Sequence, residues 1–543
     1  MRSNSMIPPS RWLRTSWLRT STFVALATLA FVASAVAAET EPVVKTTTGE
    51  LRGTLTSKGR AEFLGIPYAQ PPVSDLRWRP PVPMKPWKSV RDVQHFGAPC
   101  AQMPAGEWNR RDAENSQEDC LFLNVITPHW PVKQKLPVMF WIHGGANTGG
   151  TASSALYKDG TLIDHGIILV TVNYRLGVFG FFAHPELTKE SPHHASGDYG
   201  LMDQIAALRW VHDNIANFGG DPANVTVFGQ SAGAHDASLL MVSPLAKGLF
   251  EKVIGESGTS FGFGTNSLVE AEQNGKKLVD LVKVPESKDT LKYLRGLSVS
   301  EIFKALEPGD QIAQRPEFAF NVDGWVIPMH PAKVFAAGQE APVAMIMGSN
   351  SREFDFPASA DALRNRIHEV YGELADKVLQ AYGLNDGGSG KTDPIYGTVA
   401  NQYAADGLFR CPAVAQSTLH QAAHHRTYEY QLEHAIPGHE SEGSVHSADL
   451  PYVFGFYPEH GNIGGVFGDA DHKLAEIIEE YWTNFAKTGD PNGKGLPHWP
   501  EFDGAKAFIR FTQDVQVVAG EGLRKQQCDL YREGLEQKLK QAN

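Results

Sequence analysis

The chain has 543 residues, of which 42% are hydrophobic and 20% charged, a composition that excludes disordered, collagen-like and coiled-coil proteins. Its formal charge is −12 and it has no basic block, which disfavours a nucleic-acid partner. Four cysteines are too few for a disulfide-dense scaffold, and the absence of Cys-x-x-Cys argues against a zinc ribbon.

Residues 1–37 are typical of an export signal. The segment has no Asp, Glu or Lys, and an apolar run, Phe23–Val36, leads to the small-residue exit Ala35-Val36-Ala37; its basic residues are Arg2, Arg11, Arg14 and Arg19. The run is shorter than the ~20 residues that span a bilayer, so cleavage is favoured over a membrane anchor. We therefore predict a periplasmic or secreted chain with no membrane span after processing.

From Leu136 onward, short apolar runs alternate with helical patterns, which predicts one α/β domain over residues 38–543 with a mostly parallel sheet and helices on both faces. Helices are expected over 203–217 and 231–240. Two largely helical segments, at about 259–339 and 357–425, are interpreted as insertions over the carboxyl edge of the sheet. The predicted strands are Val138–Ile142, Ile167–Val172, Val225–Phe228, Val343–Met347, Tyr428–Leu432 and Phe508–Phe511.

One serine lies in the context of a nucleophile elbow. Gly229-Gln230-Ser231-Ala232-Gly233 follows a predicted strand and opens a predicted helix, as the G-x-S-x-G turn requires. A second match, around Ser260, continues as Phe261-Gly262-Phe263-Gly264 and reads as a loop. Ser231 is therefore the candidate nucleophile, and it needs a base, an orienting carboxylate and N–H donors for the oxyanion. The loop His143-Gly144-Gly145-Ala146, directly after a strand, is placed to supply such donors.

Several motifs in the same order resemble the type-B carboxylesterases, the branch of α/β hydrolases that includes bacterial para-nitrobenzyl esterases and, more distantly, cholinesterases. The resemblance runs from about Val43 to Tyr531. Its motifs are Phe63-Leu64-Gly65-Ile66-Pro67-Tyr68-Ala69, Glu118-Asp119-Cys120-Leu121-Phe122-Leu123-Asn124-Val125, Asn173-Tyr174-Arg175, Gly219-Gly220-Asp221-Pro222, the Ser231 elbow and Trp482-Thr483-Asn484-Phe485.

The resemblance implies a catalytic triad. Ser231 matches the nucleophile, Glu353 in Gly348-Ser349-Asn350-Ser351-Arg352-Glu353 matches the acid, and His446, which precedes Asp449 and Tyr452-Val453-Phe454-Gly455, matches the base. The family's oxyanion hole corresponds to the N–H groups of Gly145, Ala146 and Ala232. Asp355 and His439 are nearby alternatives to the acid and the base that miss the motif positions, and His235 is interpreted as a packed neighbour of the site.

The resemblance also implies disulfides between Cys100 and Cys120 and between Cys411 and Cys528. In an exported protein an even number of cysteines favours bridges, although spacing alone leaves three connectivities open. Arg77 resembles the family's structural ion-pair partner of Glu118.

Three residues are expected to shape the substrate pocket. Gln230 stands where cholinesterases have Glu, which removes a charge that favours quaternary ammonium groups. Asn147 stands where the family usually has an apolar residue, so a more polar pocket is expected. Trp108 resembles the choline-site Trp, although its spacing differs, and we disfavour a cholinesterase. Arg110, Arg111 and Arg352 are candidates for attracting acidic substrates, although such residues are more often solvated surface charges.

The sequence thus predicts a serine carboxylesterase that hydrolyses a small-molecule ester through an acyl-enzyme, with neither a metal nor an organic cofactor in the reaction. A non-catalytic binding protein of the neuroligin type is the alternative from another class, and the intact triad argues against it. An acyltransferase or amidase would use the same residues.

Overall fold

The sheet that carries the candidate site has eleven strands in the order β16-β15-β14-β13-β10-β9-β7-β8-β6-β4-β3 in a computed structural model that describes residues 41–262, 264–307 and 316–541. The predicted export signal, residues 1–37, lies outside the described residues. The seven strands from β8 to β15 run parallel, and the pairs at either end are antiparallel. The strands are β3 Thr54–Leu55, β4 Ala61–Pro67, β6 Phe122–Thr127, β7 Leu136–Ile142, β8 Ile168–Val172, β9 Gly220–Gln230, β10 Lys252–Glu256, β13 Ala344–Asn350, β14 Thr427–Leu432, β15 Ala507–Phe511 and β16 Val517–Glu521.

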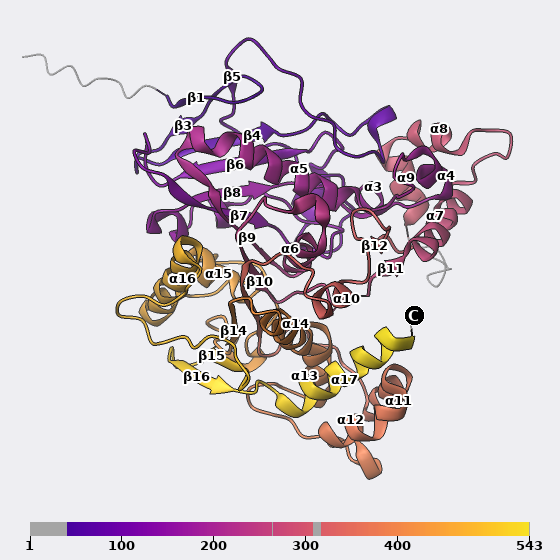
Figure 1. The fold of residues 1–543 in the computed structure, drawn as a ribbon, viewed down its shortest axis with the longest axis vertical. Coiled ribbons are helices and arrows are strands. Elements are labelled where there is room, and N and C mark those ends of the chain that lie inside the picture. Colours follow the sequence, from indigo (N-terminus) through magenta and orange to yellow (C-terminus); the bar gives the residue numbers. More distant parts are fainter. Residues whose placement is uncertain (1–40, 263, 308–315, 542–543) are drawn as a thin grey trace, which may run out of the picture. The chain divides into compact units, whose positions relative to one another are not determined.

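The parallel strands are apolar on both faces because both faces are covered by helices. Along β7, Val138, Phe140 and Ile142 enter one hydrophobic cluster, while Met139 and Trp141 enter another on the opposite face. Helices α5 (Tyr199–Asn214), α6 (Ala232–Val242) and α14 (Cys411–Ala422) pack against strands of the sheet, as does α16 (Asp469–Thr488). In Figure 1, α16 and α15 (Leu450–Phe454) lie on the other side of the strands from α6 and α14.

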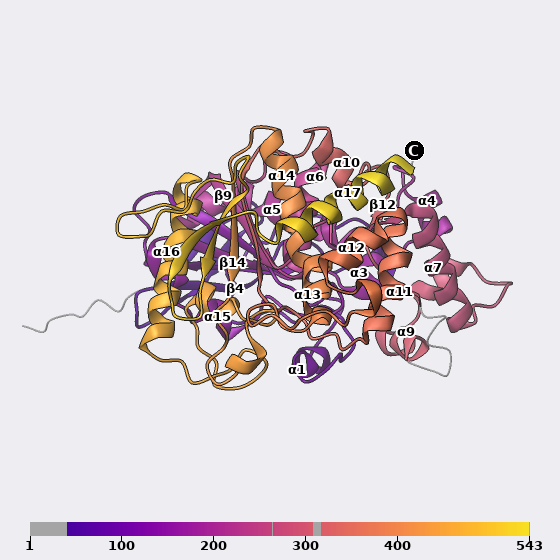
Figure 2. The ribbon, with the colours of Figure 1, turned by 90° about the horizontal axis from the view of Figure 1, so that it is seen from below.

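The first predicted insertion contains α7 (Leu268–Val282), α8 (Thr290–Arg295), α9 (Val299–Leu306) and α10 (Pro331–Ala336). Helices α7 and α9 lie at the end of the described unit away from α16 in both Figure 1 and Figure 2. The second segment contains α11 (Ala360–Tyr371), α12 (Ala375–Ala381), α13 (Val399–Ala405) and α14. One expectation is corrected here, because α14 packs against β13 and β14 and is a covering helix of the sheet rather than part of a roof.

The remaining elements are short or peripheral. Strands β1 (Val43–Lys45), β2 (Glu50–Arg52) and β5 (Arg91–Asp92) form a three-stranded sheet, and β11 (Asn266–Ser267) pairs with β12 (Asn321–Val322). The other helices are α1 Arg110–Glu114, α2 Ala155–Lys158, α3 Gly177–Phe181, α4 Pro185–Glu190 and α17 Lys525–Gln541. Within the described ranges, no helix combines the length and apolarity needed to cross a bilayer.

Both expected disulfides are present. Cys100–Cys120 closes the loop that contains α1, and Cys411–Cys528 joins α14 to α17. The expected ion pair is also confirmed, because Arg77 binds Glu118 through two hydrogen bonds of 2.6 Å and donates further bonds to the carbonyls of Leu294 and Leu297. These links fix the N-terminal loops and the C-terminal helix to the sheet that holds the site.

Candidate active site

Ser231 lies at the turn between β9 and α6 with a strained backbone, φ 58° and ψ −123°. Positive φ is uncommon for a residue with a side chain, and it is the conformation that turns a serine outward at a nucleophile elbow. The flanking glycines are required by close packing: a Cβ on Gly229 would lie 2.5 Å from the Gly233 carbonyl carbon, and one on Gly233 would lie 2.0 Å from the Ile142 carbonyl oxygen. The sequence G-x-S-x-G therefore encodes a strained turn that only these residue types allow.

Glu353 and His446 form a hydrogen-bonded pair beside this turn. Glu353 follows β13, is buried, and accepts a 2.6 Å hydrogen bond from His446 Nδ1 through Oε2. Its other oxygen accepts the Asn350 N–H at 2.7 Å, and its backbone carbonyl accepts the His446 N–H at 2.9 Å. The carboxylate thus fixes both the tautomer and the orientation of the imidazole, which is the role of the acid in a triad.

The other ring nitrogen of His446 faces the elbow. Its Nε2 lies 3.2 Å from Nε2 of Gln230, the residue before Ser231, and accepts the amide hydrogen in the tautomer that Glu353 imposes. Among the hydrogen bonds of the described residues, His446 is paired with Gln230 and not with Ser231 Oγ. Catalytic hydrogen bonds often tighten only when substrate is present. Gln230, expected only in the pocket, therefore also contacts the base.

The glycine loop after β7 lies next to the serine. Gly145 and Ala146 have φ of 112° and 54°, so this loop coils tightly, and the Gly145 carbonyl accepts the N–H groups of Thr148 and Gly149. Ala232 is the first residue of α6, where an N–H has no partner within the helix. Gly144 lies so close to the elbow that a Cβ there would be 3.1 Å from the Ser231 Cβ. The loop that contains two of the candidate oxyanion donors therefore approaches the candidate nucleophile.

A buried hydrogen-bond network joins the residue after the glycine loop to helices α5 and α6. The Asn147 amide donates to Asp236 at 2.9 Å, and Gln204 donates to the other oxygen of Asp236 at 2.6 Å. This corrects the expectation for Asn147: its side chain is buried against α6 and does not line an open pocket, because its φ of 56° turns it inward. Burial lowers the pKa of His143 to about 4, so that ring is neutral at pH 7. Its Nδ1 lies 2.8 Å from the Gly144 carbonyl oxygen.

Comparison with known proteins shows the family of the chain. The model of the carboxylesterase family matches residues 40–531. The chain belongs to this carboxylesterase family. It is 34% identical to a human cocaine esterase, with 92% of each chain covered, and 34% identical to a fumonisin B1 esterase of Sphingopyxis macrogoltabida, with 95% of each covered. Among solved structures it is similar to a PNB esterase (TM-score 0.76, 31% identity, 91% of this chain and 100% of that one) and to a carboxylesterase of Geobacillus stearothermophilus (TM-score 0.78, 28% identity, 90% and 99%).

The protein is therefore a carboxylesterase with the α/β-hydrolase fold, and aromatic side chains flank its site. Trp108 is 49% exposed, and its ring edge comes within 3.3 Å of a Cβ placed on Gly145. Phe354 lies 4.2 Å from the His446 ring, centroid to centroid, and 5.6 Å from Phe356; these two phenylalanines are 40% and 45% exposed. Exposed aromatic groups gathered at a site are typical of a surface that binds apolar parts of a ligand.

Two further buried carboxyl groups, Asp449 and Glu256, lie near the Glu353–His446 pair of the carboxylesterase. Burial, and then the charge of Glu353, raises the pKa of Asp449 to about 6. Burial, and then the charge of Asp449, raises the pKa of Glu256 well above its usual range, while Trp482 donates a 2.7 Å hydrogen bond to that carboxyl. Both carboxyl groups therefore hold a proton more tightly than an exposed carboxyl does.

The alternatives to the triad residues have other partners. Asp355 accepts a hydrogen bond from Asn401, and His439 is exposed and paired with Glu442. Ser260 is buried, with its hydroxyl 2.7 Å from that of Ser238. His235, as expected, is buried next to Asp236.

Two of the three arginines considered for acidic substrates have partners, and Arg111 is exposed. The Arg352 guanidinium donates to the carbonyls of Pro394, Ile395 and Ser441, so it is not a solvated charge, and Arg110 pairs with Glu107. Sequence reasoning missed one residue that supports the site. Arg410 is fully buried and donates to the carbonyls of Asn350 and Ser351, so it holds the turn that carries Glu353. A lone arginine between two helical patterns gave no signal of this role.

Proposed function

We propose that this carboxylesterase hydrolyses esters in two steps with Ser231 as nucleophile. His446 takes the hydroxyl proton, Oγ attacks the ester carbonyl, and the N–H groups of Gly145, Ala146 and Ala232 stabilise the oxyanion. His446 then protonates the leaving alcohol, and a water activated by the same imidazole cleaves the acyl-enzyme. The observation that carries the proposal is the 2.6 Å hydrogen bond from His446 to buried Glu353 beside a serine with φ of 58°.

Proton transfer in this scheme requires His446 Nε2 to give up its hydrogen bond with Gln230 and to form one with Ser231 Oγ. Gln230 and Ser231 are adjacent in the chain, and the contact to be given up is 3.2 Å long. Substrate binding favours this change of hydrogen-bond partner, because a carbonyl bound at the glycine loop brings Ser231 Oγ into line with the reacting carbon. Glu353 holds the ring in place throughout and stabilises the imidazolium that forms.

We propose that the substrate is an ester with an apolar or aromatic group. Trp108, Phe354 and Phe356 supply exposed aromatic surface, and Gln230 adds no negative charge that would select a cation. The fumonisin B1 esterase and the cocaine esterase, which share 34% identity with this chain, carry names that refer to very different esters, so the proposal stays at the level of the chemical class. Export to the periplasm or medium, suggested by residues 1–37, would place the enzyme where it meets esters from outside the cell.

A series of para-nitrophenyl esters with acyl chains of increasing length tests the substrate proposal. Turnover should rise with chain length or with an aromatic acyl group, and Trp108→Ala and Phe356→Ala should each raise KM for the apolar esters by roughly 5- to 20-fold, as expected from the loss of an aromatic contact. Val466→Ala removes an apolar side chain that is 90% exposed and belongs to no part of the site, and it should leave KM unchanged. Equal KM values for acetate and long-chain esters in all four proteins would contradict the proposal.

The same preparation distinguishes the other reactions that a serine triad supports. Added alcohol competes with water for the acyl-enzyme, so formation of a new ester faster than free acid would identify an acyltransferase. Faster release of para-nitroaniline from para-nitroanilides than of para-nitrophenol from the matched esters would identify an amidase. No turnover of either series would favour a binding protein on this fold.

A further inference from the structure

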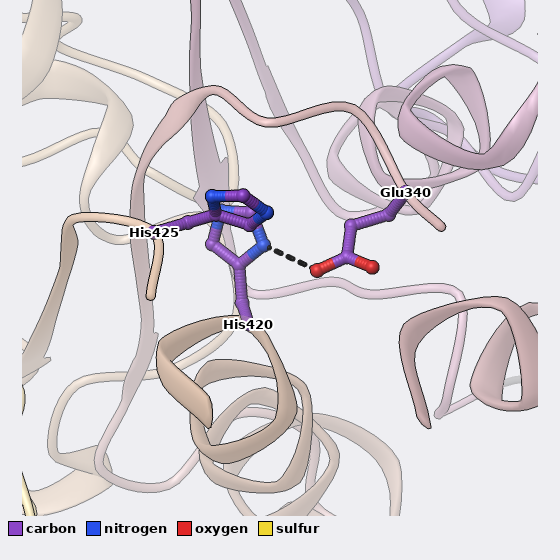
Figure 3. Close-up of side chains that lie close together, drawn as sticks. All are labelled: Glu340, His420 and His425. Atoms are coloured by element: carbon purple, nitrogen blue, oxygen red, sulfur yellow. Dashed lines mark hydrogen bonds and ion pairs between the residues drawn. The ribbon is translucent and has the colours of Figure 1, made fainter. Parts of the chain in front are cut away.

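A second cluster of polar side chains lies far from Ser231. Glu340 follows α10, His420 is in the last turn of α14, and His425 is in the turn that leads into β14. Figure 3 shows the two imidazoles lying against each other with the Glu340 carboxylate beside them. One donor atom from each residue lies within 4.8 Å of the others, and among the described residues this is the one cluster of its kind. Glu340 and His420 are buried, and His425 is half-buried.

The hydrogen bonds of His420 fix its tautomer. Its Nε2 lies 2.8 Å from the Val343 carbonyl oxygen, an acceptor only, so Nε2 carries a hydrogen. Its Nδ1 lies 2.9 Å from Glu340 Oε1. In the neutral ring Nδ1 is a lone pair, and two lone pairs at this distance require a cation between or beside them, either a proton or a metal ion. A histidine that donates one N–H to a backbone carbonyl and presents the other nitrogen to the ligand is the usual arrangement at metal sites.

The rest of the cluster favours a metal ion over a proton. A proton on Nδ1 would satisfy Glu340 Oε1, but Oε2 of the same buried carboxylate would still have no hydrogen-bond partner among the described residues. The His425 ring, centred 4.7 Å from the His420 ring, also offers a nitrogen to the same space. A metal ion would use the second carboxylate oxygen and the second imidazole together.

We propose that Glu340, His420 and His425 bind a divalent transition-metal ion of the zinc type. One carboxylate and two imidazoles are ligands that Zn²⁺ prefers, and a water molecule completes a tetrahedron on the half-exposed side of His425. Ligands at the usual 2.0–2.1 Å from zinc lie about 3.4 Å apart in a tetrahedron. The Glu340–His420 contact of 2.9 Å would widen by about 0.5 Å to reach that separation, and a side-chain rotation of His425 would bring in the third ligand.

The position of the site makes its role structural. Val343 immediately precedes β13 and His425 lies two residues before β14, so the cluster lies at the amino ends of the parallel strands, whereas Glu353 follows the carboxyl end of β13. The seven residues of β13 separate the two ends by roughly 20 Å. The metal would join the segment after α10 to the end of α14 and the start of β14. It is not part of the ester-hydrolysis chemistry.

Zinc binding by the full chain, prepared without a histidine tag and stripped with a chelator, tests the proposal. The wild type should retain one Zn²⁺ per chain after dialysis, measured by elemental analysis, and its apparent Tm should rise by about 3 °C at a zinc concentration 100 times Kd. Co²⁺ should give the visible absorption of a tetrahedral site. Esterase turnover should be the same with and without the metal.

Two variants and one control locate the site. His425→Gln replaces a half-exposed side chain and should fold, yet it should lose the bound ion, the Co²⁺ spectrum and the rise in Tm. Glu340→Gln keeps the shape of the carboxylate and should lose the same three signals while it retains esterase turnover. His424→Asn alters the adjacent exposed histidine, whose φ of 65° an asparagine tolerates, and should behave as the wild type. A wild type without stoichiometric zinc, or equal binding by the His425→Gln variant, would overturn the proposal and leave only a buried hydrogen bond between His420 and Glu340.

Discussion

At the scale of single residues, the site depends on one carboxylate that holds one imidazole. Glu353 is buried, its φ is 55°, and both of its oxygens are engaged, by His446 and by the Asn350 N–H. The surrounding protein therefore keeps the base in a single tautomer before any substrate arrives. Arg410 contributes indirectly by binding the two carbonyls of the turn that leads to Glu353.

Replacing Glu353 with Gln should lower kcat by about 10³- to 10⁴-fold, because the amide cannot impose the reactive tautomer or stabilise the imidazolium. Steady-state kinetics on a para-nitrophenyl ester measures the effect. Asp355→Asn is the matched control, since that carboxylate is two residues away and binds Asn401 instead. If Asp355→Asn were the more damaging of the two changes, the acid would be wrongly assigned.

Asp449 makes the stability of the fold depend on pH. Burial and the charge of Glu353 raise its pKa from 3.8 to about 6, so the folded state binds its proton more tightly than the unfolded state. Stability is therefore lost as pH rises from about 4 to about 6, and the penalty is complete above that range. Asp449→Asn should be more stable than the wild type by an amount of order 1–3 kcal/mol above pH 6, and the difference should shrink toward pH 4.

Denaturant midpoints of the two proteins, measured from pH 4 to pH 8, test this prediction. A difference that stays constant over the whole range would show that Asp449 titrates normally in the folded protein.

At the scale of elements, the parallel strands could be predicted because burial on both faces leaves continuous apolar runs. The run Val138–Ile142 is an example, and the structure extends it only to Leu136. Strand β10 was not predicted, because Val253 and Ile254 stand between Lys252 and Gly255-Glu256 and give too short a run. Strands β4 and β6, which pair antiparallel with a bulge between Phe63 and Ile66, lie before Leu136 and were also not predicted.

The parts of the site that the sequence did not reveal are those that depend on backbone direction or on distant contacts. Asn147 was assigned to the pocket from its position after Ala146, but its positive φ turns the amide toward Asp236. Arg410 and Asn350 are 60 residues apart and meet only because α14 returns to cover β13. The Glu353–His446 pair and both disulfides could be predicted because their motifs are local in sequence and the family resemblance supplies the pairing.

The Cys411–Cys528 bridge fixes α17 to α14 at the element scale. Its sequence separation is 117 residues, and Tyr531 on the same helix donates a hydrogen bond to the Phe261 carbonyl. The Cys411→Ser/Cys528→Ser double variant should lose stability, by up to about 5 kcal/mol in the loop-entropy model, and α17 should become the first site of proteolysis.

Limited proteolysis followed by mass spectrometry measures this directly. The Cys100→Ser/Cys120→Ser variant serves for comparison, because its loop of 20 residues predicts a smaller loss of about 3 kcal/mol and no release of α17. Equal resistance of α17 to protease with and without the Cys411–Cys528 bridge would contradict the prediction.

At the scale of the whole molecule, the sheet separates two kinds of chemistry. The carboxyl ends of β9 and β13 carry Ser231 and Glu353, where exposed aromatic side chains gather, while the amino ends of β13 and β14 carry the proposed metal site. Ester hydrolysis and metal-dependent stability should therefore vary independently.

The most direct test of the account is covalent labelling of the nucleophile. A serine-directed phosphonate, which mimics the tetrahedral intermediate, should abolish ester turnover with one label per chain, and peptide mapping should place that label on Ser231. The Ser231→Ala variant should be neither labelled nor active, while Ser260→Ala, which alters the buried second G-x-S-x-G serine, should be labelled as the wild type. Ester turnover that survives in Ser231→Ala, or a label found on another residue, would contradict the central claim.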